Sequence, residues 1–132
     1  MNRITRATLI KRNDTARLVE PHSKRERNTV RINSGNTFKH EFAKFFLCWK
    51  LKQEGSEFIS EAIFQRRYAR TDVLDLDECV AYEVMHSENQ QSIDAKKDFY
   101  PKEVTIVAVK AEDLIQEALK TLKGETDGRK EG

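Results

Sequence analysis

The chain has 132 residues, of which 38% are apolar and 35% are charged, and its net charge is +2. This length predicts one domain with a thin core and leaves no room for a second catalytic module. No apolar run approaches the roughly 20 residues of a membrane helix, and the N-terminus lacks the apolar stretch of a secretory signal. We therefore expect a cytoplasmic protein with no membrane contact and no small-molecule cofactor, in which Cys48 and Cys79 are reduced packing residues.

The N-terminal part of the chain is basic. Residues 1–40 hold ten Lys and Arg against three Asp and Glu, a local charge of +7, so the remainder of the chain has a charge of −5. A basic arm gains affinity for nucleic acid by releasing counterions from phosphates, although a solvated leader has the same composition. The predicted DNA-binding residues are seven cations of this arm and one at the start of a later strand: Arg3, Arg6, Lys11, Arg12, Lys24, Arg25, Arg27 and Arg70.

Residues 1–35 show no sustained periodicity, which predicts an arm or an irregular cover. A helix follows, with Asn36 or Thr37 as its N-cap and Gly55 at its end. Its aromatic residues recur at helical spacing and predict a buried face for core packing, not a base-stacking platform. These aromatic residues are Phe38, Phe42, Phe45, Phe46 and Trp49.

Three runs rich in aliphatic and β-branched residues come next, at 57–64, 70–76 and 79–86. The polar breaks between them are short, which favours an antiparallel meander over crossover connections. Residues 87–101 then place Ile93 and Tyr100 on one helical face and end at a proline, so we expect a second helix there.

The remaining pattern predicts one more strand and one more helix. The continuous apolar run 104–109 is typical of a central strand covered on both faces. Residues 111–123 form an amphipathic helix with acids at its start and lysines at its end, and 124–132 are expected to be a disordered tail.

The predicted element order is therefore helix, strand, strand, strand, helix, strand, helix. A strand, helix, strand unit after a meander indicates an α/β fold with a mixed sheet and helices on both of its faces. The domain organisation that follows is an arm at 1–35, a core domain at 36–123 and a tail at 124–132.

Two acids interrupt apolar strand faces. Asp72 shares a face with Leu74, and Glu83 shares a face with Ala81 and Met85. A carboxylate among aliphatic side chains costs several kcal/mol unless it is paired or binds a metal. A salt bridge from Arg66 or Arg70 is one solution, and a Mg²⁺ ion held by two carboxylates on adjacent strands is the other.

The motifs with this element order resemble the PD-(D/E)XK nuclease superfamily, which has a restriction-endonuclease-like core. The similarity covers about residues 37–122 and is greatest to the branch with Holliday-junction resolvases and competence-associated nucleases. It rests on an R-x-D-V segment and an E-V-x-x-S segment, followed by a helix, a tyrosine and an apolar strand. The matching residues are Arg70-Thr71-Asp72-Val73, Glu83-Val84-Met85-His86-Ser87, Tyr100 and the run 104–109.

The resemblance implies a site in which Asp72 and Glu83 bind Mg²⁺ or Mn²⁺, Glu61 adds a metal ligand and Glu41 supports the site from the first helix. The sequence departs from the family at Met85, where members have a lysine that activates or orients the attacking water. Methionine cannot replace that lysine. His86 is expected on the opposite strand face, and Lys96 or Lys97 on the next helix are candidates for a migrated lysine.

Two functions follow from this reading. The first is a metal-dependent DNA endonuclease, and the alternative is an inactive nuclease-fold protein that binds DNA or assembles with proteins. Retention of the costly acids favours the enzyme, whereas Met85 favours the alternative. The sequence leaves the oligomeric state open, and the resemblance points to a homodimer because two DNA strands need two sites.

Overall fold

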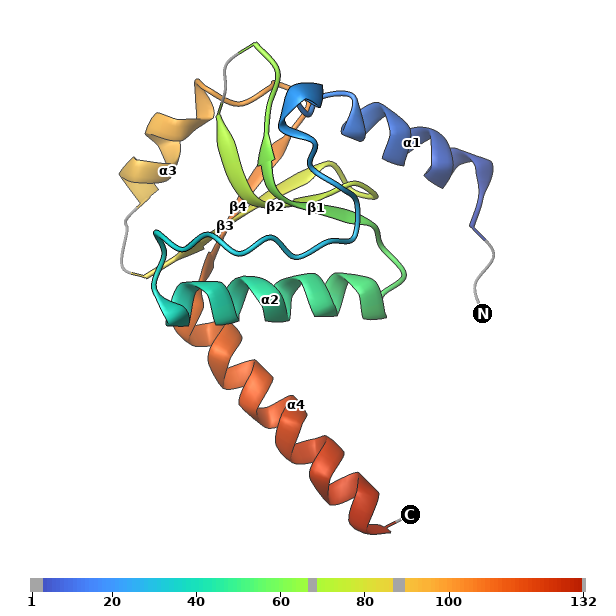
Figure 1. Cartoon of the computed structure of the whole chain (residues 1–132), viewed down its shortest axis with the longest axis vertical. Coiled ribbons are helices and arrows are strands. Elements are labelled where there is room, and N and C mark those ends of the chain that lie inside the picture. The colour runs from blue at the N-terminus through green and yellow to red at the C-terminus, as the bar shows by residue number, and fades with distance from the viewer. Residues whose placement is uncertain (1–3, 67–68, 87–89, 132) are drawn as a thin grey trace.

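The computed structural model describes residues 4–66, 69–86 and 90–131, which form a mixed α/β fold around a four-stranded sheet (Figure 1). From residue 38 onward the element order is the predicted one, helix, three strands, helix, strand, helix. The elements are α2 (Phe38–Gln53), β1 (Phe58–Ile63), β2 (Arg70–Asp75), β3 (Val80–Met85), α3 (Gln90–Lys97), β4 (Thr105–Lys110) and α4 (Ala111–Glu131).

The sheet has the order β1-β2-β3-β4, with two antiparallel pairs followed by a parallel pair between β3 and β4. The parallel pair requires the crossover through α3, as predicted for the second half of the chain. The prediction that the last strand is central and covered on both faces is wrong. β4 lies at the edge of the sheet and most of its residues are exposed, including Val107 at 37%.

Helices α2 and α4 pack together against one face of the sheet (Figure 1). Thr37 is the N-cap of α2, since its side chain accepts a hydrogen bond from the backbone N–H of His40, as expected from the sequence. The core on this face includes Phe46, Leu47 and Val73. α4 continues to Glu131 and projects from the body, so the residues predicted as a disordered tail are helical up to that point.

The opposite face of the sheet is covered by the end of the N-terminal helix α1 (Arg6–Ala16) with the residues that follow it, and by the segment that precedes β4. Leu74 and Ala81 from the sheet pack there with Val19 and with Tyr100, which follows α3. The Tyr100 hydroxyl donates a hydrogen bond of 2.8 Å to the carbonyl oxygen of Arg70. This bond fixes the start of β2, where the candidate site opens.

The segment predicted to be an arm contains a helix, α1 (Arg6–Ala16), and a short 3₁₀ helix, η1 (Pro21–Ser23). Thr5 caps α1 through a 3.1 Å hydrogen bond from the N–H of Thr8. Apolar periodicity could not reveal α1, because its buried residues are Arg12 and Thr15. The helix is polar on most sides and is fixed by one buried arginine.

Residues 27–33, which we call the strap, run beside β1 and connect α1 to α2 (Figure 1). The strap binds β1 through side chains as well as backbone: the Ser60 hydroxyl donates to the Thr29 carbonyl oxygen (2.6 Å) and accepts from the Arg31 N–H (2.8 Å). In the described part of the chain no helix is both long enough and apolar enough to cross a membrane.

Candidate active site

A polar cleft opens where β2 and β3 separate. Their backbone pairing reaches Val73 and Tyr82 and is not continued toward the start of β2. There, the Asp72 carboxylate takes the place of a backbone acceptor, since its Oδ2 accepts a 2.7 Å hydrogen bond from the Val84 N–H. Continuing the register by one residue brings Asp72 opposite Glu83, so the two acids lie beside each other on neighbouring strands.

A third acid faces Asp72 from the other side. Ala62 pairs with Thr71, so the register places Glu61 opposite Asp72, where β1 and β2 form no backbone pair. Glu61 has a φ angle of 51°, a left-handed conformation that is rare for a residue with a side chain. Three acids predicted from the sequence therefore lie in one row across β1, β2 and β3.

Glu83 is the least satisfied of these acids. It is 5% exposed, and its Oε1 atom has no hydrogen-bond partner among the residues that the structure describes. Burial raises the pKa of Glu83 to about 8, and the negative charges of Asp72 and Glu61 add to this rise. Without a cation in the cleft, Glu83 therefore keeps a proton at neutral pH.

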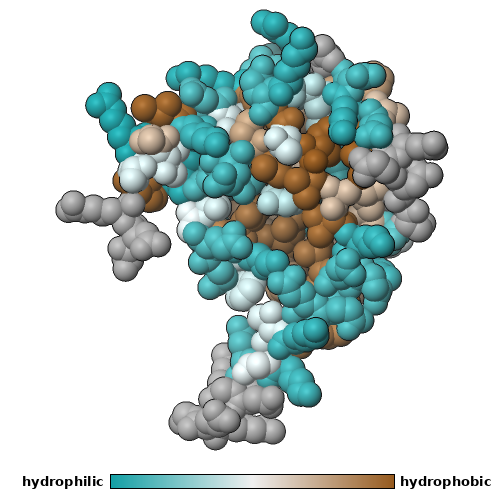
Figure 2. Space-filling view, turned by 180° about the vertical axis from the view of Figure 1, so that it is seen from behind, coloured by the Kyte–Doolittle hydropathy of each residue, from teal (hydrophilic) through white to brown (hydrophobic). Residues whose placement is uncertain are grey.

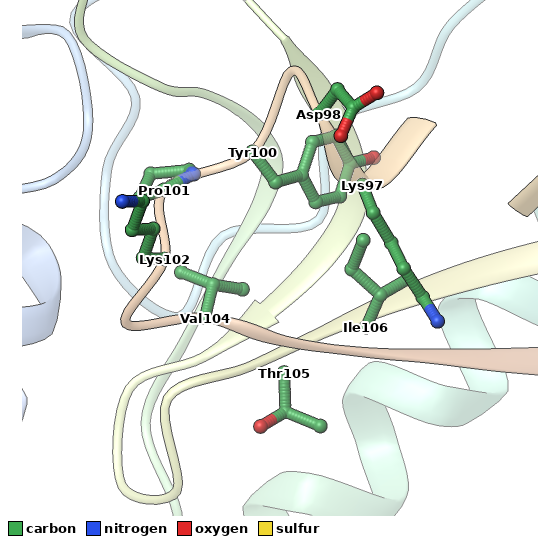
Figure 3. A pocket seen from close by; sticks show the side chains of 8 residues that line it. All are labelled: Lys97, Asp98, Tyr100, Pro101, Lys102, Val104, Thr105 and Ile106. Carbon is green, nitrogen blue, oxygen red and sulfur yellow. The ribbon is translucent and has the colours of Figure 1, made fainter. Parts of the chain in front are cut away.

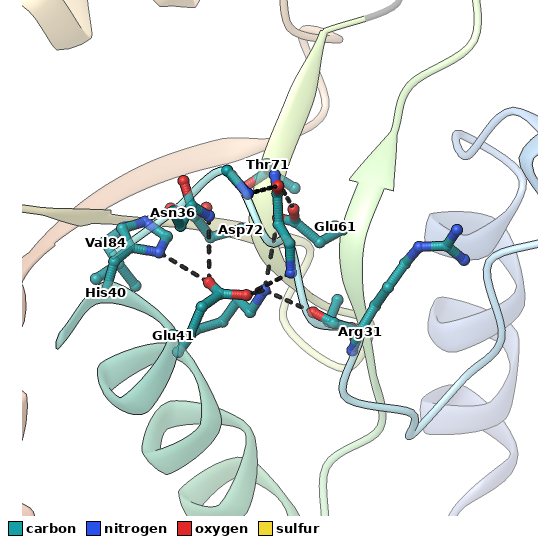
Figure 4. A network of polar contacts seen from close by, with 12 residues as sticks. Arg31, Asn36, His40, Glu41, Glu61, Thr71, Asp72 and Val84 are labelled. Carbon is teal, nitrogen blue, oxygen red and sulfur yellow. Dashed lines mark hydrogen bonds and ion pairs between the residues drawn. The ribbon is translucent and has the colours of Figure 1, made fainter. Parts of the chain in front are cut away.

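His40, at the start of α2, connects two acids. Its Nε2 lies 3.4 Å from Asp72 Oδ2, and its Nδ1 lies 3.1 Å from Glu41 Oε2 (Figure 4). The hydrogen bond to Asp72 is the main cause that raises the pKa of His40 to about 9. His40 is therefore an imidazolium at neutral pH that orients Asp72. Sequence reasoning missed it, because a single histidine on a helix has no distinguishing pattern.

Glu41 lies in a closed ionic network behind the cleft. Burial opposes its ionisation, but the Lys44 ammonium at 2.7 Å, the Asn33 N–H at 2.6 Å and His40 lower the pKa of Glu41 to about 2. Lys44 is fully buried and also donates to the Arg31 carbonyl oxygen at 2.6 Å (Figure 4). Glu41 thus holds the strap and Lys44 in place and does not line the cleft.

The same network restrains Glu61. Its Oε1 accepts a 3.0 Å hydrogen bond from the Asn33 side chain, and its Oε2 is 4.0 Å from the Lys44 ammonium. Asn33 and Lys44 were not identified from the sequence, since the contact depends on the path of the strap beside β1.

The cleft has a volume of about 390 Å³ and combines acids with a cationic rim. The acids Glu61, Asp72 and Glu83 line it together with four groups that are positive or can become positive. These four groups are His40, Arg70, His86 and Lys96. His86, expected on the opposite strand face, is within 3.4 Å of the Thr37 hydroxyl at the cleft rim.

The two candidate lysines occupy different places. Lys96 lines the cleft, and its positive charge opposes the rise in the pKa of Glu83. Lys97 makes a 3.1 Å ion pair with Asp94 and lines another cavity, beside Tyr100 and Pro101 (Figure 3). Only Lys96 of this pair is therefore positioned to contact a molecule bound in the cleft.

Met85 is buried at 4% exposure and its Cα is paired with that of Lys110 on β4. It offers no polar atom to the cleft. Lys96 and His40 line the cleft, whereas Met85 is absent from its lining.

The predicted DNA-binding cations fall into two groups. Arg12 and Arg27 are engaged within the protein, through ion pairs to Asp77 and Glu57. The other described residues among the predicted DNA-binding cations of the arm make no such ion pair with a described residue: Arg6 and Lys11 on α1, Lys24 after η1, and Arg25, whose Nε donates to the Glu61 carbonyl oxygen. Arg70 lines the cleft. Arg3 and Ser87 lie outside the described residues.

Two carboxylates of the cleft have oxygen atoms that suit a hard divalent cation. Asp72 and Glu83, whose Oε1 has no partner among the described residues, provide oxygen ligands of the kind that Mg²⁺ and Mn²⁺ prefer. Glu61 is turned toward Asn33 and Lys44. Accordingly, across residues 4–66, 69–86 and 90–131, no three His, Cys, Asp or Glu side chains are arranged as a ready metal cluster.

Comparison with known proteins gives no match to any protein-family model, curated protein or solved structure. The site is therefore interpreted from its own geometry.

Proposed function

We propose that this protein is a metal-dependent DNA endonuclease that hydrolyses phosphodiester bonds, with Asp72 and Glu83 holding Mg²⁺ or Mn²⁺. The observation that supports this most directly is the buried Oε1 of Glu83, which has no partner among the described residues and lies next to a second carboxylate. A decayed site has no physical reason to keep such an arrangement, because it costs free energy in the folded protein.

A divalent cation would relieve this cost. Two carboxylates on adjacent strands, crowded by Glu61, repel one another when all are ionised. Asp72 and Glu83 would hold the ion, and the free Oε1 of Glu83 would then gain a partner in place of the proton. When bound, the ion supplies a water molecule with a lowered pKa and stabilises charge on the phosphoryl oxygens.

The protein's own residues then have distinct roles. His40 orients Asp72, while Asn33 and Lys44 hold Glu61 in its place at the back of the cleft. Lys96 on α3 takes over the phosphate or water contact that Met85 cannot make. Glu41 supports the site indirectly, through its bonds to His40 and Lys44.

The cationic surroundings support a polyanionic substrate. Arg70 and Lys96 line the cleft, and α1 adds exposed cations that include Arg6 and Lys11. Such charges attract a nucleic-acid backbone and align it with the acids. We place the enzyme in the cytoplasm, where the free thiols of Cys48 and Cys79 stay reduced.

We further propose a homodimer, because one site hydrolyses one strand. The support comes from the apolar surface around the edge strand: Val107 on β4 and Leu119 and Leu122 on α4 are exposed. Figure 2 shows apolar side chains gathered across the middle of the face opposite to that of Figure 1. Surfaces of this kind commonly mark association sites.

The second candidate function is DNA binding without catalysis. The observation that favours it is Met85, which is buried and leaves the position of the family lysine without a polar group. In that case the acids would serve the internal network of His40 and Lys44, and no cation would bind.

Cleavage of supercoiled and branched DNA in Mg²⁺ or Mn²⁺ separates the two functions. We expect cleavage by the wild type, loss of at least about 100-fold in Asp72→Asn and Glu83→Gln, and full activity in Glu103→Gln, an exposed acid outside the cleft. Absence of cleavage, or cleavage unaffected by the Asp72 and Glu83 substitutions, would refute the enzyme and leave the DNA-binding function.

A further inference from the structure

Three arginines are attached to one short stretch of β1. Arg25 donates from Nε to the carbonyl oxygen of Glu61 at 2.9 Å. Arg31, on the strap, is fixed by the 2.8 Å bond from its N–H to the Ser60 hydroxyl. Arg70 is the Cα partner of Ile63 at the start of β2. Segments far apart in the sequence thus bring three arginines to β1, where the charges of Arg31 and Arg70 both act on Arg25.

These arginines have no carboxylate partner among the residues that the structure describes. Other arginines of the N-terminal segment do, since Arg12 pairs with Asp77 and Arg27 with Glu57. Arg31 and Arg70 are exposed. Burial lowers the pKa of Arg25, and the positive charges of the other two lower it further, while the charges of Glu61 and Glu20 oppose this fall only in part. The cluster is therefore a set of like charges that repel one another within the folded protein.

The anchoring of Arg25 follows from the unusual backbone of β1. With its positive φ, Glu61 forms no ladder pair with β2, and its carbonyl oxygen accepts from the Arg25 side chain. Among the described residues, Arg25 donates from its Nε and, weakly, from one Nη, the latter at 3.5 Å from the Ser23 carbonyl oxygen. The guanidinium keeps further N–H groups for an external acceptor.

We propose that Arg25, Arg31 and Arg70 form a phosphate-binding site beside the acidic cleft. Planar guanidinium forks match phosphate oxygens, and an anion would cancel the repulsion among the three charges. Because Arg70 also lines the cleft, the site would hold a phosphate next to the one at Asp72 and Glu83. The nucleic-acid nature of the ligand rests on the proposed function. The phosphate is either an internal diester or a terminal monoester of the strand.

The site would thus set how the strand enters the cleft, with one phosphate anchored on the β1 side. This is a positional role that the metal ligands cannot have, because they contact only the reacting group.

The test measures binding in EDTA, so that no cleavage is required. Fluorescence anisotropy would follow a short single-stranded oligonucleotide with a 5′-phosphate or a 5′-hydroxyl, and inorganic phosphate would be added as competitor at constant ionic strength. Variants Arg31→Gln, Arg70→Gln and their combination are compared with Lys120→Gln, an exposed cation of α4. Arg31→Lys and Arg70→Lys keep the charge and remove the fork.

We expect the double Gln variant to bind at least about tenfold more weakly, with the slope of log affinity against log salt reduced by roughly 1 per arginine, and Lys120→Gln to bind as the wild type. A preference for the 5′-phosphate identifies a terminal monoester, and equal binding of both oligonucleotides identifies an internal diester. Wild-type affinity in the double variant, or equal losses in Lys120→Gln, would overturn the proposal. Lack of cleavage with this binding intact would instead refute only the endonuclease.

Discussion

Two buried ionic centres of this protein differ in how completely their atoms are paired. At the first, Arg12 is 3% exposed and donates to both carboxylate oxygens of Asp77, at 2.6 and 2.9 Å, and to the Gly55 carbonyl oxygen at 2.8 Å. At the second, Glu83 is just as buried, but one of its oxygens lacks a partner in the described structure.

The difference distinguishes a centre whose carboxylate oxygens are paired from a centre that leaves one carboxylate oxygen free in the described structure. The Arg12 centre binds α1 to the β2–β3 hairpin, and both carboxylate oxygens of Asp77 accept hydrogen bonds from Arg12. The Glu83 centre keeps two acids side by side, and burial with the charge of Asp72 raises the pKa of Glu83 to about 8. Burial and charge alone do not distinguish such centres. The distinguishing feature is whether each buried polar atom has a hydrogen-bond partner.

The largest expected effect comes from removing the saturated centre. Arg12→Ala should lower the free energy of unfolding by about 3 kcal/mol, because it leaves Asp77 without its buried partner. Urea unfolding measures the change. The control is Arg17→Ala, which breaks an exposed pair with Asp14 and should change stability by less than about 0.5 kcal/mol. Equal effects of the two substitutions would contradict a structural role for Arg12.

Glu83 should make the free energy of unfolding of the metal-free protein depend on pH. The pKa of Glu83 is about 8 in the folded protein and ordinary in the unfolded chain, so the folded state binds more protons between these values. Stability is then highest below the unfolded pKa and falls as pH rises toward 8.

In Glu83→Gln this loss should shrink, because the amide does not ionise. Unfolding in urea with EDTA, at several values between pH 5 and pH 8, compares the variant with the wild type. A pH profile that is identical in both proteins would show that Glu83 is not the strained group.

The two lysines of α3 test the role of the cleft through the rate of DNA cleavage. Lys96→Ala should reduce DNA cleavage by about tenfold, because Lys96 lines the cleft, while Lys97→Ala should leave the rate unchanged. Initial rates at saturating Mn²⁺ measure both. A reversed result would show that Lys97 and not Lys96 takes part in cleavage, which would place the reaction outside this cleft.

The smallest effect is expected at His40, which contacts both Asp72 in the cleft and Glu41 in the network behind it. The pKa of His40 is raised to about 9, so its stabilisation is complete below the ordinary value and disappears as pH rises through 9. His40→Asn should cost about 1 kcal/mol at pH 7 and little at pH 10. A cost that does not change with pH would show that the imidazolium charge is not involved.

The sequence was sufficient for the elements whose apolar pattern is strong. The aromatic spacing of α2 and the alternation in β1 to β3 gave these elements within one or two residues of their observed ends. α1 was missed because one buried arginine fixes it. β4 was placed wrongly because Val104 to Val109 read as a doubly covered strand, although strand order is set by the crossover and not by local hydropathy.

The candidate site, too, could be predicted from the sequence only in part. Strand alternation predicted that Asp72 and Glu83 need partners, and the register brings them together with Glu61. His40 and Lys44 could not be found, because their contacts depend on how α2 and the strap approach the end of the sheet. Local pattern predicts which side chain is costly, whereas tertiary structure decides what relieves the cost.

Direct titration of Mn²⁺, followed by the loss of the free-ion electron paramagnetic resonance signal, tests the central claim. The account predicts saturable binding to the wild type and to Glu103→Gln, and binding weakened at least about tenfold in Asp72→Asn and Glu83→Gln. Wild-type Mn²⁺ affinity in both cleft variants, or no saturable binding to the wild type, would contradict a metal site at Asp72 and Glu83.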